Sequence, residues 1–225
     1  MRVRRRCSDM RVGFARGNRP ILAQTRDRKS YMSFDLPAAL AALPAFPQLR
    51  GPRVRLRGPR REDADAVFAL FSDPAVMRYW SRPPMIVRDE AAALIAEMQE
   101  AFAERDKLNW VVVDKRDEAI GTCTLFRFDA RHRHAELGYA LRSDLWGQGL
   151  AREAASAALD WAFRTLRLHR VEADIDPRNE ASRRILRRLG FVSEGVLRER
   201  FFVGDQATDS EVFGLLAEDW MKREA

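Results

Sequence analysis

The sequence predicts an α/β domain built around a mixed, largely antiparallel central sheet that is flanked by helices. Two amphipathic helical patterns precede three strand-like runs, and only short polar turns separate those runs, as in an antiparallel meander. Further along, a helix stands directly between two strands, which implies a parallel crossover. Two more strand-like runs joined by a short turn close the pattern. Helices and strands that alternate in this way indicate one layered α/β unit.

The first half of this unit is expected to contain one strand and then helices. Residues 53–59 ("RVRLRGP") alternate apolar and polar side chains, as a strand does. Residues 61–73 follow as a helix with acids in its opening turn, which the helix dipole favours. A short helical turn over 74–84 ends at two prolines. The apolar spacing of 88–106 predicts a second amphipathic helix.

The second half carries most of the expected strands. Asn179 is a plausible N-cap and Gly190 a C-terminal residue of one helix, and Gly204 is the expected pivot of the last turn. Strands are predicted at 108–114, 118–129, 133–142, 169–176, 191–203 and 208–220, and helices at 150–163 and 177–190.

The basic charge of the chain belongs to its beginning. The formal charge of the 225 residues is +7, yet residues 1–31 alone hold ten Arg or Lys and two acids, and the remainder holds thirty basic and thirty-one acidic residues. We therefore expect residues 1–50 to be a basic disordered leader and a loose connector, and residues 51–225 to form the domain. Met32 is a candidate translation start. A nucleic-acid-binding arm is the less favoured interpretation of the leader.

Several protein classes are disfavoured by the composition. No stretch approaches the roughly 20 apolar residues that a bilayer-spanning helix needs, so we expect no membrane partner. Cys7 and Cys123 are the only cysteines, and neither has Cys or His neighbours at metal-ligand spacing, so no metal is expected. A reducing cytoplasm is the simplest location for such a chain.

The segment "LWGQGLAREA" places Gly147 and Gly149 where a long helix begins. The first amides of a helix have no partner inside it, and together with the helix dipole they form an anion site. Glycine lets a phosphate approach this backbone. A P-loop is excluded because Leu150-Ala151 stands where it needs Lys-Ser or Lys-Thr, and a dinucleotide fingerprint fits the spacing poorly. A plain tight turn into a helix is the alternative.

Four segments in order resemble the GNAT acetyltransferase superfamily, and specifically its RimJ/RimL-type protein N-acetyltransferase branch. These are "VRLRGPRREDADAVFALFSDPAVMRYW", "AELGYALRSDLWGQGLAREA", "NEASRRILRRLGF" and "DSEVFGLLAEDW". The resemblance runs from about Arg53 to Trp220. One departure is Trp146, which stands where the superfamily commonly has Gln or Arg; Gly149 and Ala151 match its small positions.

This resemblance implies a GNAT-like fold and acetyl-CoA as co-substrate. It further implies that the pyrophosphate is held by the main-chain amides of Gln148, Gly149, Leu150 and Ala151. The backbone around Tyr139 and Leu141 would pair with the pantetheine arm as an added strand. Asn179 would hydrogen-bond the pantetheine, or serve only as the helix cap.

The reaction implied is direct attack of an amine on the thioester while both substrates are bound. The amine must lose a proton, and the leaving thiolate needs a hydrogen-bond donor or a proton. Glu136 is the candidate base, acting directly or through a water; alternatively it is a solvent-facing strand residue. Many superfamily members carry a tyrosine where this chain has Leu186, so Ser182 is the candidate donor to the sulfur, or a local backbone partner. Trp80 and Phe126 are candidate acceptor-pocket residues, although core packing also explains them.

We expect an N-acetyltransferase acting on a primary amine, foremost a protein or peptide N-terminus. Small amines such as a polyamine, an amino acid or an aminoglycoside are the second group of acceptors. A non-catalytic module that binds acyl-CoA is the rival class, kept open by the missing tyrosine. A homodimer is left open. The histidines at 132, 134 and 169 fit solvated or capping roles better than catalysis.

Overall fold

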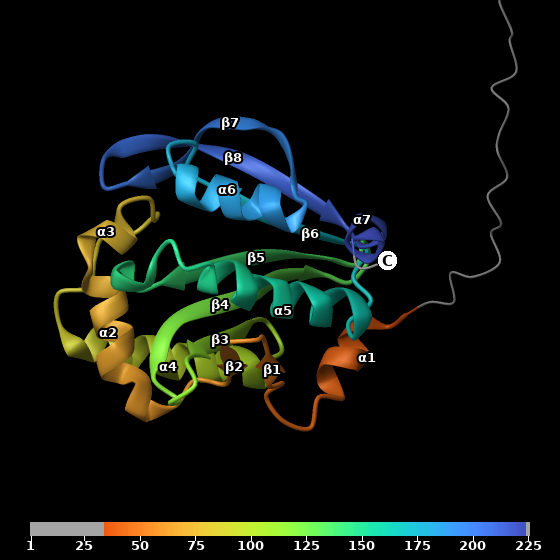
Figure 1. Cartoon of the computed structure of the whole chain (residues 1–225), viewed down its shortest axis with the longest axis horizontal. Helices are drawn as coiled ribbons and strands as arrows, with labels where there is room; N and C mark the ends of the chain where they lie inside the picture. Colours follow the sequence, from red (N-terminus) through yellow and green to blue (C-terminus); the bar gives the residue numbers. More distant parts are fainter. Residues whose placement is uncertain (1–33, 224–225) are drawn as a thin grey trace, which may run out of the picture. The chain divides into compact units, whose positions relative to one another are not determined.

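The computed structural model describes residues 34–223, and one compact unit begins at Phe34 (Figure 1). The expectations for residues 1–33 lie outside the described residues. The helices of this unit are α1 (Leu36–Ala41), α2 (Ala64–Ser72), α3 (Pro74–Met77), α4 (Arg88–Ala103), α5 (Leu150–Arg164), α6 (Glu180–Leu189) and α7 (Ala217–Lys222). The strands are β1 (Leu49–Arg50), β2 (Arg55–Arg57), β3 (Leu108–Val113), β4 (Ala119–Asp129), β5 (His134–Leu141), β6 (Arg170–Ile175), β7 (Val192–Val203) and β8 (Gln206–Leu216).

All eight described strands belong to one sheet, in the order β1-β2-β3-β4-β5-β6-β8-β7. Neighbouring strands are antiparallel except β5 and β6, which are parallel and joined by α5. The expected meander and the expected crossover are both confirmed. The mixed, largely antiparallel α/β fold predicted from the sequence is therefore the observed one.

Helices pack against both faces of the sheet, as the alternation along β5 shows. Leu137 and Leu141 belong to the larger core, which includes the apolar face of α5, whereas Ala140 belongs to a second core with residues of α2 and α4. Successive side chains of a strand point to opposite faces, so the two cores lie on opposite sides of the sheet. This arrangement leaves the strand ends near α3 and the start of α6 available for a site.

Residues 34–50 are packed against the domain, which differs from the loose connector expected. Leu36 and Leu40 are one helical turn apart and buried in the larger core. Asp35 caps α1 by accepting a hydrogen bond from the Ala38 amide at 2.9 Å. Further on, the Trp110 indole donates to the Pro47 carbonyl at 2.8 Å. The Ala- and Leu-rich composition that suggested a connector is that of an apolar helix seated on the core.

The last expected strand is shorter than predicted and continues as α7. β8 ends at Leu216, and acidic Glu218 and Asp219 occupy the first turn of the helix, where the helix dipole favours them. Trp220 is buried on α7 and packs near Phe163 of α5. The apolar residues at 213, 215 and 220 thus belong to two elements that cover the same core.

Candidate active site

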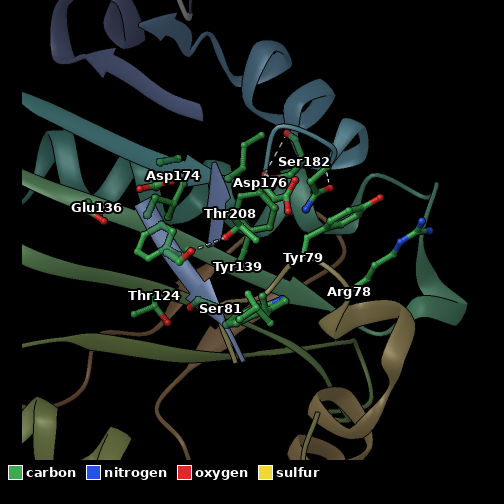
Figure 2. Close-up of a pocket in the computed structure, with 18 of the residues that line it drawn as sticks. Arg78, Tyr79, Ser81, Thr124, Glu136, Tyr139, Asp174, Asp176, Ser182 and Thr208 are labelled. Atoms are coloured by element: carbon green, nitrogen blue, oxygen red, sulfur yellow. Dashed lines mark hydrogen bonds between the residues drawn. The ribbon is translucent and has the colours of Figure 1, made fainter. Parts of the chain in front are cut away.

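A cleft of about 730 Å³ opens where β5 and β6 separate. The two strands pair only at His134↔Arg170, Ala135↔Val171 and Glu136↔Glu172, although both continue beyond these residues. The part of β5 after Glu136 therefore presents a strand edge towards β6 that no strand covers. Figure 2 shows side chains of β5, β6, α6 and the segment after α3 around this cleft.

The glycine-entered helix begins as the sequence predicts. Gly147 and Gly149 have φ values of 77° and 80°, a left-handed conformation that glycine adopts without steric cost. Gly149 is the N-cap of α5 and has no side chain to cap it. Within residues 34–223, the main-chain amides of Leu150, Ala151 and Arg152 donate to no group. These amides, at the positive end of a 15-residue helix, are therefore a potential anion site.

Two contacts that sequence reasoning missed hold this turn in place. Arg53 Nη2 donates to the Gln148 carbonyl at 2.9 Å, and its Nε contacts Glu153 Oε2 at 3.0 Å. The guanidinium is half exposed, so it adds positive charge beside the amides. Trp146 Nε1 donates to the Leu141 carbonyl at 2.8 Å, which ties the turn to the end of β5. A partner 95 residues away in the chain leaves no local signal.

Three residues predicted for separate roles meet at the start of α6. Asn179 caps the helix by accepting from the Ser182 amide at 3.1 Å, so the cap role is observed. Its side-chain nitrogen has no hydrogen-bond partner in the described part of the chain. The Ser182 hydroxyl lies 2.8 Å from the Tyr139 hydroxyl on β5. All three residues line the cleft (Figure 2 labels Tyr139 and Ser182).

Glu136 lies in the cleft and is buried, in place of the solvent-facing position that was its alternative. Both of its carboxylate oxygens contact Arg127 Nη1, at 2.9 and 3.1 Å. Arg127 itself is more than half exposed. A charge-assisted bond of this kind stabilises the carboxylate, but an exposed guanidinium can move aside when an acceptor enters.

Asp174 is a second cleft carboxylate, which sequence reasoning missed. It lies on β6 two residues beyond Glu172, so it faces the same side of the sheet as Glu136. Arg200 Nε donates to its Oδ2 at 2.9 Å, whereas its buried Oδ1 has no hydrogen-bond partner among the described residues. Burial, with the nearby Glu136 charge, holds the pKa of Asp174 above its ordinary value although Arg200 opposes the shift.

The expected acceptor-pocket residues also line the cleft. Trp80 packs edge-on against Phe71 at 5.3 Å between ring centroids, so it serves the second core as well. Phe126 is paired with Glu136 across β4 and β5. The β7–β8 hairpin supplies a further wall, from Phe201, Val203, Gln206, Thr208 and Asp209. Leu186, in contrast, is fully buried in the larger core and cannot reach substrate.

The remaining candidates lie away from this chemistry. His132 bonds Asp129 in an exposed turn, and His134 contacts Glu172 at 3.2 Å. Among residues 34–223, no group of three or more His, Cys, Asp or Glu side chains is arranged to hold a metal ion. In the same range no helix has the length and apolar character to cross a membrane.

Comparison with known sequences gives one family over most of the chain. Residues 53–192 match the family described as acetyltransferase (GNAT) domain. The uncharacterized N-acetyltransferase YoaA of Bacillus subtilis (strain 168) is 34% identical over 173 residues, which are 76% of this chain and 97% of that protein. The spermidine N(1)-acetyltransferase of Escherichia coli (strain K12) is 33% identical over 153 residues, 68% of this chain and 80% of that protein.

Solved structures with the same fold include two that were determined with CoA or CoA-disulfide. Spermidine N-acetyltransferase from Vibrio cholerae, solved with CoA and spermine, has a TM-score of 0.66 and 27% identity, covering 75% of this chain and 98% of its own. Mycobacterium smegmatis RimJ, solved with CoA-disulfide, has a TM-score of 0.69 and 26% identity, covering 76% of this chain and 87% of its own.

Proposed function

This chain belongs to the GNAT acetyltransferase family, and we propose that it acetylates the N-terminal amine of a protein or peptide as a RimJ/RimL-like member. Family membership makes it an N-acetyltransferase with acetyl-CoA as co-substrate. The four segments that resemble the RimJ/RimL branch favour this acceptor, and a coincidence of geometry supports acetyl transfer to an amine at this site. An uncovered strand edge on β5 runs from the anion site of α5 to a cleft that holds Glu136 and Ser182.

The residues of the anion site fit the carrier part of acetyl-CoA. We assign the pyrophosphate to the amides of Gln148, Gly149, Leu150 and Ala151, with Arg53 as a neighbouring positive charge. The β5 edge around Tyr139 and Leu141 would pair with the amide groups of pantetheine as strand addition does. Asn179 can offer its unpartnered side-chain nitrogen to the same arm. Bound acetyl-CoA would supply the activated acetyl group.

In the cleft, Glu136 would act as the base. An amine is protonated near neutral pH, so it must lose a proton before its lone pair can attack the carbonyl carbon. Glu136 would take that proton, directly or through a water, once Arg127 yields its place. Ser182 would then donate a hydrogen bond to the sulfur as the carbon–sulfur bond breaks. The acetyl group would therefore pass directly from one bound substrate to the other.

A small amine is the second candidate acceptor, and the spermidine acetyltransferase relatives favour it about as well as the RimJ neighbour favours a protein N-terminus. The cleft suits either one. It combines aromatic walls, Trp80 and Phe126, with the carboxylates of Glu136 and Asp174, which attract an ammonium group. In both cases Trp80, Phe126 and the two carboxylates would contact the acceptor.

Two measurements test the proposal in order. Calorimetric titration with CoA tests the carrier site, and the absence of heat and of a thermal shift at millimolar CoA would remove the assignment. Release of free thiol from acetyl-CoA is then followed with peptides of different N-terminal residues, spermidine, free amino acids and an aminoglycoside. Preference for peptides supports the first acceptor class, and preference for spermidine supports the second. CoA binding without turnover on any acceptor would favour a non-catalytic module.

Glu136→Gln is the sharpest variant of this function. Removal of the base should lower kcat by about a hundredfold or more while the affinity for CoA stays nearly intact. The matched control is Glu172→Gln, which neutralises the neighbouring carboxylate on β6 that does not line the cleft. An unchanged rate in Glu136→Gln would exclude Glu136 as base.

A further inference from the structure

The hydroxyl pair of Tyr139 and Ser182 joins two elements that are far apart in sequence. Tyr139 comes from β5 and Ser182 from the first turn of α6, and their oxygens are 2.8 Å apart. Among residues 34–223, the other hydrogen-bond acceptor of the phenol is the Ser182 main-chain carbonyl, at 3.5 Å, which is marginal for a hydrogen bond. The serine hydroxyl is thus engaged with β5, and its backbone amide is held separately by Asn179.

The direction of this hydrogen bond decides what Ser182 can do. A serine hydroxyl has one hydrogen to donate and two lone pairs to accept with. If the phenol donates, the serine accepts with one lone pair and keeps its own hydrogen for another acceptor. If the serine donates, it has no hydrogen left for a substrate atom. Burial raises the pKa of Tyr139, so the phenol keeps its proton throughout the working range and remains able to donate.

The sulfur of the departing carrier is the acceptor that this hydrogen would serve. Leu186, which stands where many superfamily members have a tyrosine, is fully buried. Ser182 lines the cleft and is held at its amide by Asn179 and at its oxygen by Tyr139. The hydroxyls of Thr124 and Thr208, which also line the cleft, donate to protein oxygens and so have no hydrogen left for a substrate atom.

We propose that Tyr139 is a positioning residue that acts through Ser182: the phenol donates to Ser182 Oγ and so directs the serine hydrogen at the leaving sulfur. This inference rests on the acetyl transfer proposed above. The first proton of the ammonium goes to Glu136, the nitrogen–carbon bond forms, and the carbon–sulfur bond breaks with its electron pair on sulfur. The second proton, which the nitrogen loses as the amide forms, is taken up by the departing thiolate, so the products are the acetylated amine and free CoA. Ser182 stabilises that charge by its hydrogen bond, and Tyr139 itself gives up no proton.

Three variants of the whole chain test this arrangement through kcat. Ser182→Ala should lower kcat about a hundredfold, and Tyr139→Phe about tenfold, with the KM for acetyl-CoA changed less than about twofold in both. The double variant should be no slower than Ser182→Ala alone, because Tyr139 acts only through the serine. Tyr79→Phe, which removes the hydroxyl of another cleft tyrosine, measures the background, and the loss at Tyr139 should exceed it.

A second readout is independent of the acceptor. Donors aimed at the sulfur should lower the pKa of the CoA thiol when CoA is bound, and the ultraviolet absorbance of the thiolate reports that titration. Its pKa should rise in Ser182→Ala and in Tyr139→Phe, whereas loss of packing alone would not move it. Losses of kcat that multiply in the double variant, or an unchanged thiol pKa in Tyr139→Phe, would overturn the inference.

The two proposals fail in different ways. If CoA does not bind to the unaltered chain, the proposed function falls. If CoA binds and an acceptor is acetylated at equal rates by the unaltered chain and Tyr139→Phe, the function stands and the role of Tyr139 is refuted. If CoA binds and no acceptor turns over, the thiol titration still decides whether the two hydroxyls face the sulfur.

Discussion

The start of α5 and the β6–hairpin side of the cleft offer different groups to a ligand. At α5 these groups are main-chain amides, exposed because Gly147 and Gly149 adopt left-handed backbone. In the cleft they are side chains from β4, β6, the β7–β8 hairpin and the segment that follows α3. The α5 half is formed by adjacent residues with Arg53 as a distant contact, whereas the lining of the cleft extends from Arg78 to Asp209.

The contrast between a backbone site and a side-chain site explains why the co-substrate is easier to propose than the acceptor. A backbone site depends on glycine positions and a helix start, so it persists while the surrounding side chains vary, and it serves a co-substrate common to a family. A site of side chains changes with each loop. In the proposed assignment the carrier half would hold acetyl-CoA, whereas the acceptor stays unassigned, since the relatives include a spermidine acetyltransferase and RimJ.

The largest effect is expected from closing the backbone site. Gly149→Val forces a β-branched residue into φ 80° and should weaken acetyl-CoA binding by more than about 100-fold. Calorimetry measures this. Gly204→Val, a glycine with φ 59° in the β7–β8 turn, controls for backbone strain and should leave the affinity for acetyl-CoA unchanged.

Ala151→Asp guards against the possibility that the glycine variant fails to fold. A carboxylate in the first turn of α5 favours the helix through its dipole, yet it repels a diphosphate. We expect unchanged or higher stability together with about tenfold weaker binding of acetyl-CoA. Undiminished binding in this variant would mean that the amides of α5 do not hold the diphosphate.

An intermediate effect is expected on the side-chain half. Phe126→Ala removes an aromatic wall of the cleft and should raise the KM for the acceptor about tenfold. The KM for acetyl-CoA should stay within about twofold, because Phe126 is remote from the α5 amides in the proposed assignment. Steady-state kinetics with both substrates varied separates the two constants. A rise confined to the KM for acetyl-CoA would contradict the separation of the carrier site from the acceptor site.

A smaller effect, a gain in thermal stability in place of a loss of binding, is expected when Asp174 is neutralised. Its folded-state pKa is raised, so ionisation opposes folding above that pKa and the penalty disappears as the pH falls through it. Asp174→Asn should therefore raise Tm by about 2 °C at neutral pH, with no gain under acidic conditions, while acceptor turnover decreases. Calorimetric melts across pH check this.

Glu172→Gln is the matched control for the stability effect. Glu172 precedes Asp174 on the same strand face, but Arg170 Nε donates to its Oε1 at 2.7 Å and its side chain is about a quarter exposed to solvent. Its neutralisation should bring no gain in Tm. If both variants gained equally, general repulsion among acids, and not the unpartnered oxygen of Asp174, would be the cause.

The smallest effect is expected at Cys123, which pairs with Tyr139 across β4 and β5 and faces the larger core. Burial raises the pKa of this thiol to about 12. In a Cys7→Ser background, Cys123 should resist a thiol reagent until the protein unfolds, and Cys123→Ala should retain turnover. Rapid labelling together with loss of turnover would contradict direct transfer and favour a mechanism through an acyl-cysteine.

The sequence predicted the features that depend on a residue and its near neighbours in the chain, namely helix ends and strand patterns. Asn179 and Gly190 mark the ends of α6, and Gly149 marks the start of α5, because capping chemistry depends on one residue and its neighbours. The apolar alternation of the strands predicted the meander. These features were confirmed, while the roles assigned to individual site residues stay predictions.

The features that the sequence did not predict depend on contacts between distant segments. Arg53 donates to the Gln148 carbonyl, and Asp174 accepts from Arg200, which lies on a strand with an irregular register. No periodicity signals such pairs. α1 was missed because its alanines and leucines are typical of either a linker or an apolar helix, and burial of Leu36 and Leu40 distinguishes them only once the core is known.

The position of α1 has a practical consequence for anyone who trims the chain. Removing everything before residue 51 would uncover the apolar surface now shielded by Leu36 and Leu40, and would delete β1 from the sheet margin. Such a shortened protein should expose an apolar surface and aggregate during purification. A protein that begins at Met32 should not, because it retains Leu36 and Leu40 over that surface. The boundary that a cloning experiment should respect is set by packing and lies well before the first residue of family likeness.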